Sequence, residues 1–241
     1  MPPAGPIVSG VDTSDCTVAP TAAVDVILPC LDEAAALPDV LAAFPPGYRP
    51  IVVDNGSSDG SADVAARHGA QVVREDRRGY GAAVHAGVLA SGTDVVCVLD
   101  ADGSLDPAEL PALVSPIADG IADLTVGRRV PSSRSAWPWH ARLGNAALAA
   151  LLRRRGLAVH DIAPMRAMHR ERLLSLGIRD RACGYPLELL IRARQERLRL
   201  LEIDVTYRPR TAGTRSKVSG SLTGTVRAVR DMTAVLSRAS S

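Results

Sequence analysis

Short apolar runs alternate with longer amphipathic segments over the first half of the chain. The runs at 24–28, 50–53, 70–74 and 94–99 are rich in β-branched residues and have the length of buried strands. Alanine- and leucine-rich segments follow them and predict helices from Asp32-Glu33 onward, up to Gly69, over 81–91 and over 107–117. This alternation predicts an α/β fold in a single domain, with a mainly parallel central sheet and helices on both faces.

The second half of the chain is less regular. Residues 131–140 are typical of a loop, 141–156 of a helix with a basic end, and 181–200 of a loop followed by a helix. The alternating segment 201–210 predicts a strand, which leads into a basic, glycine- and serine-rich loop and an amphipathic helix over 222–236. We expect this half to complete the sheet.

Charge and cysteine content narrow the class of protein. Lys and Arg number 28 and Asp and Glu 26, a balance that argues against general nucleic-acid binding. The four cysteines have neither CxxC nor Cys/His spacing, which favours a reduced, cytoplasmic protein. We expect no transmembrane segment and at most peripheral membrane contact, because no apolar run approaches the ~18–20 residues that span a bilayer. Residues 1–23 lack the features of a signal peptide and predict a disordered leader.

Acidic residues follow three of the predicted strands. In a parallel sheet the carboxyl ends of the strands share one edge, so we expect these carboxylates to converge there. Such carboxylates can hold a divalent cation or accept hydrogen bonds from a sugar or a base. We name this set the acidic rim: Asp32, Glu33, Asp54, Asp59, Asp100 and Asp102.

Turn and helix-cap chemistry offers a simpler explanation for the same residues. Asn-Gly and Asp-Gly pairs bend chains, and Asp-x-Asp occurs in ordinary turns. Asp32 or Asp59 can cap the helix that follows, and Glu33 suits the first turn of a helix because of the helix dipole. Capping and ligand binding are compatible at these positions.

The segment DADGS at 100–104 resembles the DXD motif of nucleotide-sugar glycosyltransferases with the GT-A fold. Three further segments occur in the same order as in family 2 glycosyltransferases, especially the dolichyl-phosphate mannose synthase-like branch: PCLDEA (29–34), VVDNGSSDGS (52–61) and RRGYGAAVHAG (77–87). The resemblance covers roughly residues 24–232. It implies a Rossmann-like GT-A fold and transfer of a hexose-type sugar, with inversion, from a UDP- or GDP-sugar.

The resemblance also implies which residues bind the donor and the metal. Asp100 and Asp102 would hold Mg²⁺ or Mn²⁺, which neutralises the charge that grows on the diphosphate as the sugar bond breaks. Many relatives have Asp where this chain has Asn55, so the base of the donor stays open. The implied donor-binding residues are Pro29, Asp32, Glu33, Asp54, Gly79, Asp100, Ala101, Asp102, Arg128, Arg166, Arg215 and Lys217.

The same resemblance implies a glycosyltransferase domain over residues 24–241 that consists of three parts. Residues 24–130 would form the donor half, 131–221 the acceptor half with its basic loop, and 222–241 a C-terminal helix. The acceptor would be a polyprenyl phosphate or a soluble metabolite. The trio Arg153-Arg154-Arg155 would approach a lipid surface, or simply end a solvated helix.

A transfer to a hydroxyl needs a general base, and a carboxylate suits that role. We expect Glu188, in GYPLELL, to be the first candidate and Asp161, in HDIAPMRAMHRERL, the second. The other interpretation of Glu188 is a partner for the dipole of the helix that it begins. A phosphate acceptor, already ionised near neutral pH, requires no strong base.

Three other functions are compatible with parts of this pattern. A sugar-phosphate nucleotidyltransferase shares the sheet and the metal chemistry, but the glycine-rich phosphate loop expected after its first strand is absent from PCLDEA. A phosphatase with an aspartyl nucleophile would carry a different sequence after its DXD. A non-catalytic nucleotide-sugar binding protein would bind the donor and metal without turnover.

Overall fold

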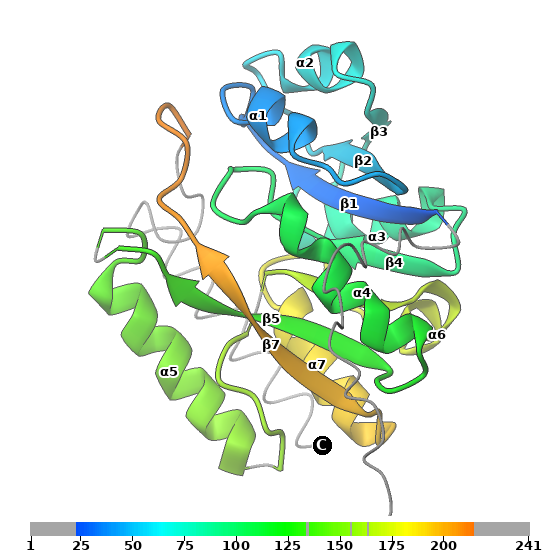
Figure 1. Ribbon diagram of the computed structural model, residues 1–241, viewed down its shortest axis with the longest axis vertical. Helices are drawn as coiled ribbons and strands as arrows, with labels where there is room; N and C mark the ends of the chain where they lie inside the picture. Colours follow the sequence, from blue (N-terminus) through cyan, green and yellow to red (C-terminus); the bar gives the residue numbers. More distant parts are fainter. Residues whose placement is uncertain (1–22, 134, 155, 163, 215–241) are drawn as a thin grey trace, which may run out of the picture.

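A seven-stranded sheet forms the centre of the computed structural model, which describes residues 23–133, 135–154, 156–162 and 164–214 (Figure 1). The strand order is β3-β2-β1-β4-β6-β5-β7. The strands are β1 (Val24–Cys30), β2 (Tyr48–Asp54), β3 (Gln71–Arg74), β4 (Val95–Val98), β5 (Leu124–Pro131), β6 (Arg166–His169) and β7 (Leu200–Tyr207).

The sheet is parallel except at β6, which runs antiparallel to both β4 and β5. The predicted α/β fold with a mainly parallel sheet is therefore confirmed. Strand β6 has only four residues, too few for a recognisable alternating pattern, and was not predicted. Its neighbours β4 and β5 hold it in the sheet by pairing with it on both sides.

Two apolar clusters pack on the two faces of the sheet, and side chains of β1 alternate between them. Val26 and Leu28 lie in one cluster and Ile27 lies in the other, as the two-residue period of a strand requires. The first face is covered by α1 (Leu37–Ala42), α2 (Ser61–Arg67) and α4 (Leu110–Ala118), the last of which follows the short 3₁₀ helix η1 (Pro107–Glu109). The second face is covered by α3 (Tyr80–Ala90), α6 (Arg170–Ser175) and α7 (Tyr185–Gln195).

Helix α5 (Trp139–Arg154) lies along the edge of the sheet formed by β5 and β7 (Figure 1). Its side chain Leu152 joins the second apolar cluster, whereas Leu143 is exposed. None of the helices in the described part of the chain is both long and apolar enough to cross a membrane.

The predicted start of the first helix is wrong. The helix begins at Leu37, and the residues from Asp32 to Ala36 form a loop and a turn in which the amide of Ala36 donates to the carbonyl oxygen of Glu33. Asp32 has a φ of 55° and therefore cannot lie in a right-handed helix. The predicted leader, the basic loop from residue 215 and the helix 222–236 lie outside the described residues.

Candidate active site

The carboxyl ends of β1, β2 and β4 lie at one edge of the sheet, as their parallel pairing requires. The segments that leave these ends carry all six residues of the acidic rim. The convergence expected from the sequence is therefore present. It follows from strand order, because β1 lies directly between β2 and β4.

The loops after β1 and β2 are joined by hydrogen bonds between side chains and backbone. One oxygen of Asp32 accepts from the amide of Ser58 at 2.8 Å, and the amide of Asp32 donates to Oγ of Ser57 at 3.0 Å. Asp54 accepts from the amide of Ser57 at 2.9 Å. Asp32 therefore supports the loop after β2 and does not cap the first helix.

Asp59 is part of the same loop contact. Its carboxylate accepts from the amides of Ala34 at 2.9 Å and Ser61 at 3.0 Å. Burial opposes ionisation of Asp59, but the hydrogen bonds from Ser61 and Ala34 outweigh it and lower the pKa of this carboxyl group. Asp59 thus has a structural role that fixes the two loops relative to each other.

Asn55 connects the rim to the segment that precedes α3. Its side-chain amide donates to the carbonyl oxygens of Glu75 at 2.8 Å and Arg77 at 2.9 Å, and its Oδ1 accepts from the amide of Gly79 at 2.7 Å. An ionised carboxylate cannot donate, so an aspartate here would lose two of these three hydrogen bonds. This geometry gives a reason for an asparagine at the position where many relatives have aspartate, while the base of the donor stays open.

Gly79 lies where two backbone segments approach closely. Its φ is 144°, and a Cβ atom at this position would lie 2.1 Å from the carbonyl oxygen of Arg181. Only glycine fits such an approach. The glycine is therefore needed for packing, and its predicted contact with the donor stays a prediction.

The DADGS segment places two carboxylates together at the end of β4. Asp102 is 3% exposed, accepts from the amide of Ser104 at 2.9 Å, and contacts the guanidinium of Arg210 at 2.7 Å. Burial, and then the charge of Asp102, raise the pKa of Asp100 to about 6 although three arginines oppose this effect. The two acids therefore repel each other, and a cation between them would relieve the repulsion.

The segment after β7 supplies Arg210 by running along the DADGS loop. The amide of Arg208 donates to the carbonyl oxygen of Ser104 at 2.8 Å, and the amide of Thr211 donates to that of Asp102 at 3.1 Å. These backbone contacts bring a basic segment to the acidic rim. Arg210 was missed as a site residue from the sequence, where it is the last residue of the segment 201–210 that was predicted only as a strand.

Arg129, on β5, lies near the acidic rim. Its guanidinium forms a two-pronged pair with the buried carboxylate of Asp161, at 2.8 and 2.6 Å, and lies 3.9 Å from the ring centre of Trp137. Its positive charge acts on Asp100 and opposes the rise in the pKa of that carboxyl group. Asp161 was predicted as the second candidate base. In the structure its carboxylate is paired with Arg129 and fixes the orientation of this guanidinium.

The adjacent Arg128 points to a different partner. It forms a two-pronged ion pair with Asp204 on the neighbouring strand β7, where both side chains are substantially exposed. Adjacent residues of a strand point to opposite faces, so Arg128 and Arg129 cannot both face the rim. The predicted donor contact of Arg128 thus has a competing partner in the structure.

Glu188 lies in the first turn of α7, as predicted, and its carboxylate is fully engaged. It accepts from the amides of Asp180 at 2.7 Å and Arg179 at 3.1 Å and pairs with Arg192 at 2.7 Å. Burial opposes ionisation, but these amides and Arg192 outweigh it and lower the pKa of Glu188. These contacts fix the loop before α7. The role of general base stays a prediction.

Arg166 and Tyr80 lie below the rim on the second face of the sheet. Arg166 is 3% exposed at the start of β6, where it pairs with Val98 at the end of β4. The hydroxyl of Tyr80 is buried and has no hydrogen-bond partner within the described residues. Burial and then the charge of Asp100 raise the pKa of Tyr80, so this hydroxyl lies near the DADGS segment. The signal in the sequence was an aromatic residue between Gly79 and Gly81.

The acids of the rim suit a metal ion that is coordinated partly by the protein and partly by a bound substrate. Within the described residues, no group of three or more His, Cys, Asp or Glu side chains is arranged to hold a metal. Mg²⁺ is commonly bound by one or two carboxylates, with phosphate oxygens and water as its other ligands. Asp100 and Asp102 fit that pattern. Arg215 and Lys217, predicted to contact the diphosphate, lie outside the described residues.

Known proteins resemble this chain both in sequence and in structure. The model of the family "Glycosyl transferase family 2" matches residues 25–176. An uncharacterized glycosyltransferase of Mycobacterium tuberculosis is 58% identical over 216 residues, which cover 89% of this chain and 98% of that protein. A polyprenol monophosphomannose synthase of Mycolicibacterium smegmatis is 33% identical over 235 residues, covering 88% and 87%. A dolichyl-phosphate hexose transferase of Haloferax volcanii is 33% identical over 195 residues, covering 79% and 85%.

Solved structures of similar fold include glucosyl-3-phosphoglycerate synthase of Mycobacterium tuberculosis. Its complex with Mn²⁺, UDP and glucosyl-3-phosphoglycerate has a TM-score of 0.72 and 25% identity, covering 91% of this chain and 80% of that one. Its complex with Mg²⁺ and UDP has a TM-score of 0.71 and 25% identity, covering 91% and 79%. The described sheet and its helices therefore have the arrangement of nucleotide-sugar glycosyltransferases with the GT-A fold.

Proposed function

Because the chain belongs to glycosyl transferase family 2, we propose that it transfers a hexose-type sugar, with inversion, from a UDP- or GDP-sugar to a polyprenyl phosphate. The proposal includes Mg²⁺ or Mn²⁺ as cofactor, in line with the ions bound by the solved relative. Asp100, Ala101 and Asp102 form the donor and metal segment, with Pro29, Asp32, Glu33 and Asp54 beside the nucleoside and Gly79 and Arg166 nearby.

One arrangement carries the proposal, namely the contact between an acidic pair and a basic segment at the rim. Asp100 and Asp102 would hold the divalent cation, which when bound neutralises the charge that develops on the diphosphate. Arg210 lies 2.7 Å from Asp102 and would bind phosphate oxygens beside the metal. Arg129, oriented by Asp161, would add positive charge on the acceptor side.

A phosphate acceptor agrees with the state of the two predicted bases. Asp161 is paired with Arg129, and Glu188 with Arg192 and two amides. A carboxylate held in this way is a weak base, because each contact stabilises its ionised form. An acceptor phosphate is itself ionised near neutral pH and attacks without a strong base.

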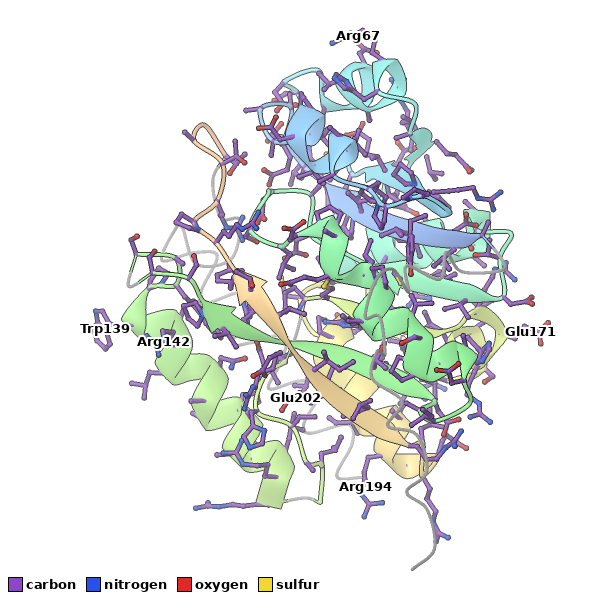
Figure 2. All side chains as sticks on the ribbon, viewed as in Figure 1. Arg67, Trp139, Arg142, Glu171, Arg194 and Glu202 are labelled. Atoms are coloured by element: carbon purple, nitrogen blue, oxygen red, sulfur yellow. The ribbon has the colours of Figure 1, made fainter. Side chains whose placement is uncertain are left out.

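The outer face of α5 supports an acceptor that resides at a membrane surface. Trp139 is 75% exposed and Leu143 63% exposed, and Figure 2 shows Trp139 and Arg142 on the outer side of this helix. Exposed apolar side chains next to arginines are typical of helices that lie at a lipid interface. Trp137, which contacts Arg129, lies just before α5, so this helix begins close to the pair of Arg129 and Asp161.

The second candidate is transfer to a soluble phosphorylated acceptor. It is favoured by the structural likeness to glucosyl-3-phosphoglycerate synthase over 91% of this chain. Both candidates use the same donor site and differ in the acceptor molecule.

A transfer assay separates the two candidates. The full chain would be incubated with Mn²⁺, a UDP- or GDP-hexose, and either a polyprenyl phosphate in vesicles or 3-phosphoglycerate, with mass spectrometry of the products. We expect glycosylated polyprenyl phosphate. Product from 3-phosphoglycerate alone would establish the second candidate. Metal-dependent donor binding without product from either acceptor would favour a non-catalytic binding protein.

A further inference from the structure

A cavity of about 400 Å³ lies on the second face of the sheet, between α3, α6 and the segment that precedes α7. One end of the cavity adjoins the rim, because the carbonyl oxygen of Arg77 accepts from the side chain of Asn55, and the rest of its wall extends away from the rim. Tyr80, which lies near Asp100, begins α3, whereas Val88 in the cavity wall lies eight residues further along the helix. At 1.5 Å per residue this separation is about 12 Å.

The polar lining of the cavity is basic. It comes from three different segments: Arg77 before α3, His85 within α3, and Arg179 and Arg181 before α7. No ion pair in the described part of the chain involves any of these arginines. Burial and then the charge of Arg181 lower the pKa of His85, against a smaller opposite effect of Glu75.

The carboxylates near this cavity are engaged elsewhere. Glu75 accepts from the amide of Arg77 at 2.8 Å. Asp180 accepts from the amides of Ala182 and Gly184, at 2.8 and 3.1 Å. Glu188 binds Arg192 and two amides on the other side of the same segment. The positive charge of the lining is therefore left for an external anion.

The rest of the wall is apolar and includes side chains from α3, α6 and α7. The volume lies in the range of small-molecule sites, and it is too small for a polyprenyl chain. Arginine guanidinium groups match the geometry of phosphate oxygens, and apolar walls favour a ligand with a carbon skeleton. The apolar residues are Val88, Leu173, Leu174, Ile178 and Tyr185.

We propose that this cavity, which lies beside the acidic rim, is a second binding site that takes a small organic phosphate. Arg77 and Arg179 bind the phosphate group, and the apolar wall contacts the carbon part. Arg181 also has a structural role, because its guanidinium donates to the carbonyl oxygen of Ile178 at 2.6 Å and its own carbonyl oxygen accepts from the amide of Ala82 at 2.9 Å. Arg77 and Arg179 are therefore the positions to change.

Isothermal titration of the full chain with butyl phosphate tests the proposal. The double variant Arg77→Ala/Arg179→Ala should bind at least about tenfold more weakly than the wild type, because two charge-assisted contacts are lost. The control is Arg67→Ala, an exposed arginine on α2, on the other face of the sheet (Figure 2). This control should bind as the wild type does.

Two further sets of measurements show whether the ligand binds outside the donor site and whether the phosphate belongs to a small molecule or to a lipid. Titrations with and without saturating UDP and Mn²⁺ should give the same affinity, and inorganic phosphate should bind more weakly than butyl phosphate. Binding of vesicles that contain phosphatidate should be unchanged in the double variant. The proposal is overturned by absence of binding, by an equal loss in Arg67→Ala, by displacement with UDP, or by an effect seen only with vesicles. These readouts need no sugar transfer, so they can succeed or fail independently of the proposed function.

Discussion

Arg210 and Asp102 form an ion pair of 2.7 Å in which the carboxylate is almost fully buried and the guanidinium is 30% exposed. The pair connects the segment after β7 to the end of β4. It also places a cation beside the two acids that would bind the metal.

Replacing Arg210 should impair donor use. In Arg210→Ala, Asp102 stays buried beside Asp100 without its partner, and the diphosphate loses a charge-assisted contact. We expect kcat/KM to fall by about tenfold to a hundredfold, since such contacts contribute about 1.5–3 kcal/mol. The matched control is Arg208→Ala, whose guanidinium contacts Asp106 at the surface. Equal activity of the two variants would contradict the role of Arg210.

Removing one charge of the acidic pair should abolish metal-dependent donor binding. Asp100→Asn keeps the shape of the side chain and removes a carboxylate whose ionisation is already disfavoured by burial and by Asp102. We therefore expect a folded protein in which Mn²⁺ no longer increases the stabilisation by UDP in a thermal-shift assay. Asp106→Asn, on the same loop but paired with Arg208, should retain the shift. A full Mn²⁺-dependent shift in Asp100→Asn would rule out this metal site.

The hydroxyl of Tyr80 should contribute to donor recognition and not to stability. It is buried near Asp100 without a partner in the described residues, so Tyr80→Phe removes an unsatisfied polar group. We expect the melting temperature to stay equal or rise, while kcat/KM for the donor falls by about fivefold to tenfold, the effect of one neutral hydrogen bond. Unchanged kinetics would show that this hydroxyl does not contact the donor.

The amide of Asn55 should be needed for folding of the rim. Asn55→Asp loses the two hydrogen bonds that it donates to the carbonyl oxygens of Glu75 and Arg77 and places a charge near them. We expect a loss of about 1–3 kcal/mol in the free energy of unfolding, measured with urea. The control Gln71→Glu changes an amide to a carboxylate at an exposed position of β3 and should have little effect. Equal stability of the two variants would contradict this role.

Asp25, at the start of β1, should make stability depend on pH. Its buried carboxylate accepts from Oγ of Ser91 at 2.9 Å and the amide of Gly92 at 2.8 Å and pairs with Arg49. Burial opposes ionisation, but these contacts outweigh it and lower the pKa of Asp25 in the folded state. The ionised Asp25 therefore contributes fully to the free energy of unfolding above the unfolded pKa of about 3.9. This contribution is lost as the pH falls through the pKa of the folded state.

Urea unfolding of Asp25→Asn measures this contribution. The variant should be about 1–3 kcal/mol less stable than the wild type at pH 7, and the difference should shrink at pH 3. The exposed Asp76→Asn, in the loop after β3, should show no difference at either pH. A difference that stays the same at both pH values would contradict the lowered pKa.

The local pattern of the chain was sufficient for the fold class and for the position of the rim. Runs such as VDVIL fit buried parallel strands, and glycine, serine and aspartate residues at their ends mark turns. Parallel strands then bring Asp32, Asp54 and Asp100 to one edge whatever the details of packing. The family could be inferred for the same reason, because its motifs are short segments at those strand ends.

The tertiary structure decided which charged side chains meet across the sheet. Arg129 and not Arg128 turns toward Asp161, because adjacent strand residues face opposite ways and β7 offers Asp204 to the other one. Arg210 reaches Asp102 because the segment after β7 pairs with the loop after β4, and Glu188 is engaged by amides of the segment before its own helix. Contacts of this kind depend on strand order and register, which join residues far apart in the chain, whereas sequence patterns report only the neighbours of each residue.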